Sequence, residues 1–347
     1  MIQRWQRFPL VRLWLVAWLS TCLVLGGCKT EAESKLRIAL IPKGTTHSFW
    51  QAIHAGALKA VAERGGVDLL WKGPAQEDKF QEQHDIVERF TSERVDAIIL
   101  APCNRQSMVA PVENALQKGI PVILIDSGLE MTPAIKTSAK YLGYIATDNK
   151  EGGREAGRYI LKLLAAGALK TKAKARVLML PYQANSESTE QREAGFKEIL
   201  SKAEQIDFII NAEEAGATVG SAQAAADRML RNHKDLDGIF ACNESSTQGV
   251  LQALRSMSPP PKLEFIGFDG SDVLIEAMKK GEIQGLVLQD PFEMGYLSTL
   301  RAIDALQGKA PAQLDLATRL RVATPANLDD PVIRAMYAPD LSFLKKG

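Results

Sequence analysis

The chain has 347 residues, of which 46% are hydrophobic and 24% are charged, and its net charge is +1. This composition is that of a globular protein and excludes a disordered or fibrous chain. A charge so close to zero argues against a general nucleic-acid binder, which needs a basic electrostatic field. The length exceeds what one hydrophobic core usually serves, and it predicts two lobes.

The N-terminus has the pattern of an export signal. Three arginines precede an uncharged apolar run from Leu13 to Gly27, which is shorter than the roughly 20 residues of a membrane span. The run ends in small residues before Cys28 and resembles the lipobox of bacterial lipoproteins, in which the cysteine becomes the lipidated first residue. A plain signal peptide or an uncleaved anchor is the alternative. We therefore expect a lipoprotein signal peptide at 1–28 and a polar tether at 29–35.

Lipidation at Cys28 would place the protein on the periplasmic or cell-envelope face of a bacterial membrane. Loss of the three signal arginines lowers the net charge to −2. Cys103 and Cys242 are then the cysteines that remain unmodified. We expect two free thiols, although an oxidising compartment also permits a disulfide between them.

Short apolar segments alternate with amphipathic stretches along the rest of the chain. Such alternation predicts an α/β fold of parallel sheets flanked by helices, because each parallel connection crosses over through a helix. Two open sheets in two similar lobes fit the length better than one closed barrel, which counting strands does not exclude. The expected strands are Leu36–Ile41, Val67–Trp71, Asp96–Ala101, Pro121–Asp126, Gly143–Ala146, Arg176–Leu180, Ile206–Ile210, Gly238–Ala241, Leu263–Phe268 and Gly285–Leu288.

A repeated pattern within the chain supports two lobes. Residues 95–126 and 236–269 each run as strand, helix and strand, with a polar cluster after the first strand and an aspartate after the second. Ligands of open α/β sheets bind beyond the carboxyl ends of the strands. We therefore expect Asp126 and Asp269 to face one cleft from opposite lobes. Each could instead be a loop residue or a helix cap.

The segment after the first expected strand begins a helix. Ser48 and Gln51 have the spacing of a capping box, and the buried stripe is expected to contain Phe49, Ile53, Gly56, Ala57 and Ala60. Trp50 lies off this stripe, close to the strand end. It could cover the apolar face of a sugar, or it could pack against a neighbouring loop.

Several short motifs follow one another in a fixed order over roughly 250 residues. They are Phe49 and Trp50 at the helix start, Ile120-Pro121-Val122 through Asp126, Thr147-Asp148-Asn149 followed by Gly152-Gly153, Arg192 with Gly195-Phe196, Asn243, Gly267-Phe268-Asp269, and Gln289. In this order they resemble the type I periplasmic substrate-binding proteins of sugar ABC importers, the ribose- and galactose-binding group.

The resemblance implies two lobes joined by a three-crossing hinge. The crossings are expected near Ala146–Asp148, Gln289–Pro291 and Arg319–Thr324. The N-terminal lobe would contain 36–147 and 290–318, and the C-terminal lobe 148–289 and 319–347.

The resemblance also implies a ligand site in the cleft. Asp126 and Asp269 would accept hydrogen bonds from sugar hydroxyls, Arg192 would donate, and aromatic rings would stack on the sugar. The expected ligand-binding residues are Lys43, His47, Phe49, Trp50, Asp126, Thr147, Arg192, Asn243, Phe268, Asp269 and Gln289.

The chain departs from the ribose-binding pattern in the first loop and after two strands. Lys43 and His47 stand where ribose binders carry small polar residues and asparagine, Ser127 replaces an arginine, and Ala101 replaces an asparagine. Lys43 could neutralise the carboxylates or meet an acidic or phosphorylated ligand. His47 could face the cleft or solvent. These departures argue against ribose itself as the ligand.

No pattern of catalytic residues competes with a binding role. None of the four histidines has a metal-ligand spacing, and the chain lacks a GxxxxGK[ST] loop and a GxSxG elbow. Gly152-Gly153 near a helix start could indicate phosphate binding, but the spacing departs from GxGxxG and Asp148 would repel phosphate. We expect no enzyme activity, no cofactor, no metal and no nucleic-acid partner.

We therefore expect a binding component that captures a monosaccharide or related polyol by hinge closure and docks on an ABC permease. The alternative is a sensor of a sugar or furanosyl signal that feeds a chemoreceptor or histidine kinase. Regulators similar to the lac repressor share this fold, but a lipobox-like segment precedes the first strand here instead of DNA-binding helices.

Overall fold

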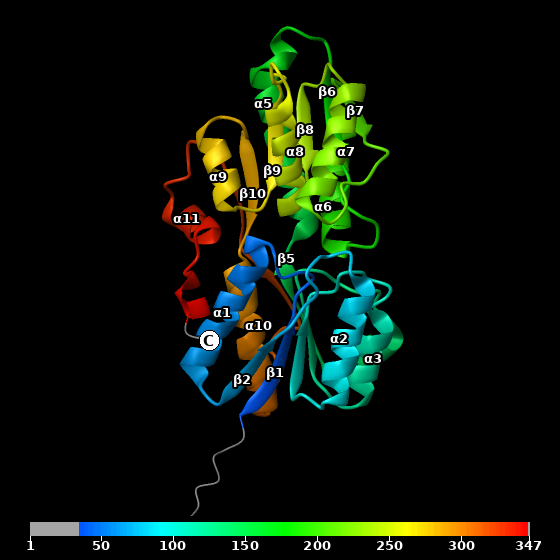
Figure 1. Cartoon of the computed structure of the whole chain (residues 1–347), viewed down its shortest axis with the longest axis vertical. Coiled ribbons are helices and arrows are strands. Elements are labelled where there is room, and N and C mark those ends of the chain that lie inside the picture. Colours follow the sequence, from blue (N-terminus) through cyan, green and yellow to red (C-terminus); the bar gives the residue numbers. More distant parts are fainter. Residues whose placement is uncertain (1–34, 346–347) are drawn as a thin grey trace, which may run out of the picture. The chain divides into compact units, whose positions relative to one another are not determined.

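The computed structural model describes residues 35–345, so the expected signal peptide, Cys28 and most of the tether lie outside the described residues. The described chain forms two separate six-stranded sheets, each flanked by helices (Figure 1). Two sheets confirm the α/β prediction and exclude a single closed barrel.

The first sheet has the strand order β11-β5-β4-β3-β1-β2, and all its pairs are parallel. With its helices it is called the first lobe below. Its strands are β1 (Leu36–Ile41), β2 (Val67–Trp71), β3 (Ala97–Leu100), β4 (Val122–Ile125), β5 (Tyr141–Thr147) and β11 (Asp315–Thr318). Its helices are α1 (Ser48–Arg64), α2 (Phe80–Ser92), α3 (Val109–Gln117), α4 (Pro133–Thr137) and α10 (Pro291–Leu306).

The second sheet has the corresponding order β12-β10-β9-β8-β6-β7 and, with its helices, forms the second lobe. Its strands are β6 (Ala175–Leu180), β7 (Ile206–Ile210), β8 (Gly238–Ala241), β9 (Glu264–Phe268), β10 (Gly285–Gln289) and β12 (Leu320–Ala323). Its helices are α5 (Asn149–Ala166), α6 (Glu187–Leu200), α7 (Val219–Asn232), α8 (Glu244–Ser256), α9 (Asp272–Lys279) and α11 (Pro331–Tyr337), with short 3-10 turns at Ala168–Lys170 and Leu341–Lys345.

Alternation along the buried strands explains why both faces of the first sheet are covered. Ile38 and Leu40 of β1 pack in the cluster that contains α1 and α10, whereas Ala39 and Ile41 pack in the cluster that contains α2 and α3. Successive side chains of a strand point to opposite faces, so a continuous apolar run needs helices on both sides. Each fully buried isoleucine or leucine stabilises the fold by about 1.5–3 kcal/mol.

The ten predicted strands are all present, but β11 and β12 were not predicted. The chain leaves the first sheet in β11 and enters the second in β12 after the single residue Arg319, within the expected third crossing. β12 runs antiparallel to β10, so the second sheet is not wholly parallel as expected. The carboxyl edges of both sheets face the cleft. β11 ends at this edge of the first sheet, so β12 begins at the same edge of the second sheet and runs opposite to its other strands.

Two other connections join the lobes at the predicted places. The chain passes from β5 to α5 after Thr147, and from β10 to α10 after Gln289. The C-terminal segment makes a further link, because Leu341–Lys345 contacts α1 of the first lobe after α11 has packed against β10 of the second (Figure 1). The exact division of residues between the lobes remains a prediction.

Gly153, the second glycine of the pair that could have indicated phosphate binding, serves helix packing. A Cβ atom at Gly153 of α5 would stand 1.9 Å from the carbonyl oxygen of Arg192 in α6, and one at Gly195 would stand 2.0 Å from that of Lys150. The two helices therefore cross with their backbones in contact. This close crossing fixes the position of Arg192 at the cleft.

None of the described helices has the length and hydrophobicity needed to cross a membrane.

Candidate functional site

The cleft lies where the carboxyl ends of strands from both sheets meet. Asp126 follows β4 in the first lobe, and Asp269 follows β9 in the second. The cavity between the lobes here has a volume of about 20 Å³, which is room for about one water molecule. Its lining contains Lys43, His47, Phe49, Trp50, Glu77, Asp126, Ser188, Thr189, Arg192, Asn243, Glu244, Asp269 and Gln289.

Lys43 forms a buried ion pair with Asp126. Its Nζ atom lies 2.9 Å from Oδ2 of Asp126 and donates a hydrogen bond of 2.8 Å to Ser188 Oγ in the second lobe. Both charged side chains are less than 5% exposed. Of the two roles considered for Lys43, the structure therefore shows neutralisation of a carboxylate. It also shows Lys43 linking the lobes directly.

Arg192 is held in place from three sides. Its Nε donates to Asn149 Oδ1 at 2.8 Å, its Nη1 donates to the carbonyl oxygen of Cys242 at 3.0 Å, and its guanidinium carbon lies 4.1 Å above the ring of Phe268. The residue is 2% exposed, so it is not a solvated helix charge. Its Nη2 lies 3.8 Å from Asp126 Oδ1, across the cleft. A guanidinium fixed in this way can present its remaining N–H groups to a ligand.

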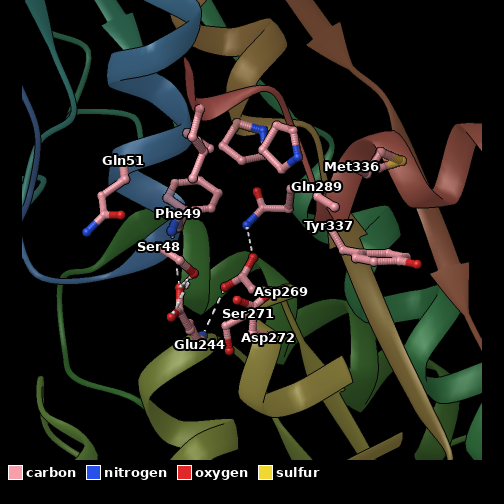
Figure 2. A pocket seen from close by; sticks show the side chains of 16 residues that line it. Ser48, Phe49, Gln51, Glu244, Asp269, Ser271, Asp272, Gln289, Met336 and Tyr337 are labelled. Carbon is pink, nitrogen blue, oxygen red and sulfur yellow. Dashed lines mark hydrogen bonds between the residues drawn. The ribbon is translucent and has the colours of Figure 1, made fainter. Parts of the chain in front are cut away.

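Asp269 is bound by neutral donors. Its Oδ1 accepts from Gln289 Nε2 at 2.7 Å, and its Oδ2 accepts from the backbone N–H of Glu244 at 2.9 Å (Figure 2). Burial raises the pKa of Asp269 to about 6, and the charges of Glu244 and Asp126 act in the same direction against Arg192 and Gln289. The other end of Gln289 is unused, because Oε1 is buried and has no hydrogen-bond partner within residues 35–345.

His47 belongs to a buried network around Glu77, a residue that the sequence analysis missed. Glu77 Oε1 lies 3.1 Å from His47 Nδ1 and accepts from Trp50 Nε1 at 2.9 Å, while its Oε2 accepts from Tyr182 of the second lobe at 2.9 Å. Burial alone would lower the pKa of His47, but the hydrogen bond and charge of Glu77 raise it to about 9. Burial would raise the pKa of Glu77, but His47, Lys43 and Trp50 lower it to about 2.

The aromatic pair at the start of α1 lies at the cleft as predicted. Phe49 and Trp50 are 9% and 2% exposed, and their rings meet edge to face at 4.9 Å. Trp50 donates to Glu77 in the loop after β2, which is the packing role considered for it, and it also lines the cavity, so the role of covering a sugar stays a prediction. The expected stripe of α1 is buried as well.

Ser48 does not cap α1, and the predicted capping box is wrong. The N-cap is His47, without a side-chain cap bond, and Ser48 is the first helical residue. Its Oγ donates instead to the carboxylate of Glu244 in the second lobe, at 3.0 Å to each oxygen. Glu244 also accepts from the backbone N–H of Phe49 at 3.2 Å. A tertiary contact across the cleft therefore replaces the local cap.

Asn243 lies at the end of β8 and caps α8. Its Oδ1 accepts from the backbone N–H of Ser246 at 3.1 Å, and Ser246 bonds back to Asn243 in a capping box. Thr147 and Phe268 do not line the cavity. Phe268 is fully buried beneath Arg192, and Thr147 Oγ1 is buried without a partner among the described residues.

The sequence analysis missed four residues of the lining. Glu244 follows Asn243 directly, and Ser188 and Thr189 lie about one helical turn before Arg192, so a helical projection from the predicted residues would have found them. Glu77 lies in an irregular loop without a motif. The residues missed are Glu77, Ser188, Thr189 and Glu244.

The cysteines and histidines form no metal centre within residues 35–345. Cys103 and Cys242 are buried free thiols, as expected. Burial raises the pKa of both thiols well above the usual value, which keeps them protonated and unreactive.

The sequence and the fold are both similar to those of known proteins. Residues 38–310 match the family described as "Periplasmic binding protein domain". A similar protein is the D-ribose/D-allose-binding protein of Pseudomonas aeruginosa, which is 27% identical over 84% of this chain and 89% of its own length.

Two crystal structures have the same fold. An ABC transporter solute-binding protein from Agrobacterium vitis with bound D-fucose has a TM-score of 0.79 and 28% identity, and the match covers 86% of this chain and 99% of that one. The periplasmic component of an ABC-type sugar transport system from Hahella chejuensis has a TM-score of 0.76 and 34% identity, over 83% and 99% of the two chains. These are solute-binding proteins rather than enzymes. The chain belongs to the periplasmic binding protein family.

Proposed function

We propose that the protein is the substrate-binding component of an ABC sugar importer and captures a monosaccharide or related polyol between its lobes. The observation that carries this proposal is that Asp126 and Asp269, from corresponding strand ends of two lobes, face one buried cavity with Arg192 beside them. Sugar hydroxyls both donate and accept, so they need carboxylates and a guanidinium at fixed positions. Phe49 and Trp50 add apolar faces for the C–H side of a sugar.

The proposed ligand site combines the residues predicted from the sequence with Glu244, which also lines the cavity. Asp126, Asp269 and Glu244 act as acceptors, and Lys43, His47 and Arg192 as donors. Gln289 and Asn243 supply amides. Thr147 and Phe268 lie behind this layer, and we propose that they support it.

The ligand enters when the lobes separate. Contacts that cross the cleft, such as Lys43 to Ser188, Ser48 to Glu244 and Tyr182 to Glu77, hold the described conformation closed. A cavity of about 20 Å³ admits no sugar without some opening. A ligand that contacts both lobes favours the closed form, because only that form makes all its contacts. We propose that 36–147 with 290–318 and 148–289 with 319–347 move as the two bodies.

The charges in the cavity favour a neutral ligand over an acidic one. Lys43 and His47 are engaged by Asp126 and Glu77, so neither is a spare cation for a phosphate or carboxylate. The closed protein is then proposed to dock on an ABC permease. Lipidation of Cys28 would hold it at the periplasmic or cell-envelope face of the membrane.

A thermal-shift screen of pentoses, hexoses, deoxysugars and furanosyl signal molecules tests the ligand class. We expect at least one sugar to raise the melting temperature, and a deletion strain to lose uptake of that sugar. Binding without any loss of uptake would contradict the transport role. No shift with any sugar would contradict sugar capture.

A further inference from the structure

A second cavity adjoins the cleft between α1, the ends of β9 and β10, and the C-terminal segment after α11. Its volume is about 360 Å³, within the range of small-molecule sites. It shares Phe49, Glu244, Asp269 and Gln289 with the cleft, so the two spaces have a common wall. Figure 2 shows these side chains together with Tyr337. This space is called the side cavity below.

The side cavity is lined by carboxylates without a compensating cation. Glu244, Asp269 and Asp272 line it, whereas no lysine, arginine or histidine does. Asp126 and Glu77 have ion-pair partners within 4 Å, but in the described part of the chain Glu244 and Asp269 have none. The donors to Glu244 are the neutral groups of Ser48, Phe49 and Gln248. Two buried carboxylates therefore lack a partner of opposite charge on this side of the cleft.

Gln289 points independently to a ligand that donates hydrogen bonds. The residue is 3% exposed and its Oε1 has no partner among the described residues. Its Nε2 is fixed on Asp269, so the amide cannot turn to satisfy the oxygen without losing that bond. Gln289 lies at the wall common to both cavities (Figure 2). An unpaired buried acceptor costs free energy that a donor from a ligand would recover.

The remaining walls suit a cation. Phe49 and Tyr337 are aromatic, and the faces of such rings attract ammonium groups. An ammonium group has three donors and no acceptor, which matches a site that offers carboxylate and amide oxygens. A neutral hydroxyl would leave the two carboxylates without an ion-pair partner within 4 Å among the described residues.

We propose that the side cavity receives a protonated amino group, so that the ligand is an amine-bearing sugar whose ring occupies the cleft. This proposal rests on sugar capture as the function. The ammonium group would donate to Gln289 Oε1 and pair with Glu244 and Asp269. Of the cations in the cleft, Lys43 and Arg192 lie beside Asp126, and His47 is paired with Glu77.

Calorimetry with matched sugars tests the proposal. D-galactosamine, D-glucosamine and D-mannosamine are each compared with the parent hexose and with the neutral N-acetyl derivative at pH 7. We expect at least one amino sugar to bind about tenfold or more tightly than both partners, because a charge-assisted hydrogen bond is stronger than a neutral one. Neutral sugars that bind as tightly as their amino counterparts would overturn the proposal and leave sugar capture intact. Binding of none of these compounds would overturn the proposal, whereas sugar capture itself is decided by the wider thermal-shift screen.

Charge removal in the side cavity is the second arm. Glu244→Gln keeps an acceptor and removes the charge, so the ratio of the affinities for the amino sugar and for the neutral sugar should fall towards one. Glu276→Gln, an exposed glutamate on α9, is the matched control and should keep the preference. If Glu244→Gln does not fold, the exposed Asp272→Asn takes its place and should lower the preference at least twofold. An unchanged preference in the folded variant would overturn the proposal.

Discussion

Asp126 and Asp269 occupy the same position in the two lobes. Each follows the third strand in its sheet order, and each has a left-handed backbone, with φ of 58° and 69°. Their backbone N–H groups donate to Ile145 of β5 and Val287 of β10, at 3.2 and 2.9 Å. Aspartate and asparagine adopt this conformation more readily than other residues with a side chain. Two equivalent turns therefore aim two carboxylates at one cavity.

The crossing of α5 and α6 should tolerate no added atom. Gly153→Ala would place a Cβ 1.9 Å from the carbonyl oxygen of Arg192. We expect it to lower the free energy of unfolding by about 1–3 kcal/mol, because the helices must separate. Urea denaturation measures this. Gly220→Ala is the control, because nothing lies within 4 Å of that Cβ and alanine favours a helix by about 1 kcal/mol. Equal effects of both substitutions would contradict a tight crossing.

The His47–Glu77 pair should make stability depend on pH. The pKa of His47 is about 9 in the folded protein, against the ordinary value of 6.5 in the unfolded chain. The folded state thus holds the proton more strongly, so the contribution is complete below pH 6.5 and is lost as the pH rises through 9. A shift of this size corresponds to about 3 kcal/mol.

Denaturation between pH 6 and 10 checks this dependence. His47→Gln should flatten the fall in the free energy of unfolding between pH 6.5 and 9. His84→Gln, on the exposed side of α2, is the control and should leave the fall in place. A wild-type protein without any loss of stability over this range would show that the pair is not formed.

Binding should weaken in mild acid because of Asp269. Its pKa is raised to about 6, so the carboxylate becomes protonated as the pH falls through 6 and loses an acceptor for sugar hydroxyls. We expect the affinity for the sugar found by screening to fall between pH 7 and 5. Asp269→Asn should have weak binding without this dependence. Titration calorimetry in buffers of matched ionic strength compares the wild type with this variant. A wild-type affinity that stays constant between pH 7 and 5 would exclude an ionised Asp269 as a ligand contact.

Membrane attachment should depend on Cys28. Cys28→Ser removes the thiol that a lipobox presents for lipidation, and the variant should leave the membrane fraction. Cys22→Ser, inside the expected signal, is the control and should remain bound. A Cys28→Ser protein that still fractionates with membranes would contradict the lipid anchor.

The regular parts of the fold follow from local patterns. Apolar runs such as Leu36–Ile41 identify the strands, and the recurrence of strand, helix, strand and aspartate identifies the two lobes. β11 and β12 are short and each has a single buried residue, so they lack the hydrophobic signal of a buried strand. Ser48 illustrates the other limit, because its partner Glu244 is distant in the sequence and replaces a plausible local cap.

The site was predictable where a residue follows a strand or begins a helix. Asp126 and Asp269 were found in this way, whereas Arg192 lies within α6 and was predicted from the family resemblance. Glu77 was not, because it lies in an irregular loop and its partners His47, Trp50 and Tyr182 are distant in the sequence. Phe268 was predicted at the cleft, but its ring lies beneath Arg192, and strand alternation alone does not show that a guanidinium will cover it.

Asp126→Asn and Asp269→Asn test the central claim most directly. Asparagine keeps the left-handed turn and removes the charge, so both variants should fold. If one sugar contacts both lobes, each substitution should weaken its binding about tenfold or more. Asp85→Asn, on the exposed face of α2, is the matched control and should bind as wild type does.

The decisive measurement is calorimetric titration of these three variants and the wild type with the sugar that binds. We predict one site per chain, weakened by both strand-end substitutions and unchanged by Asp85→Asn. A sugar that binds both strand-end variants with wild-type affinity would contradict capture between Asp126 and Asp269.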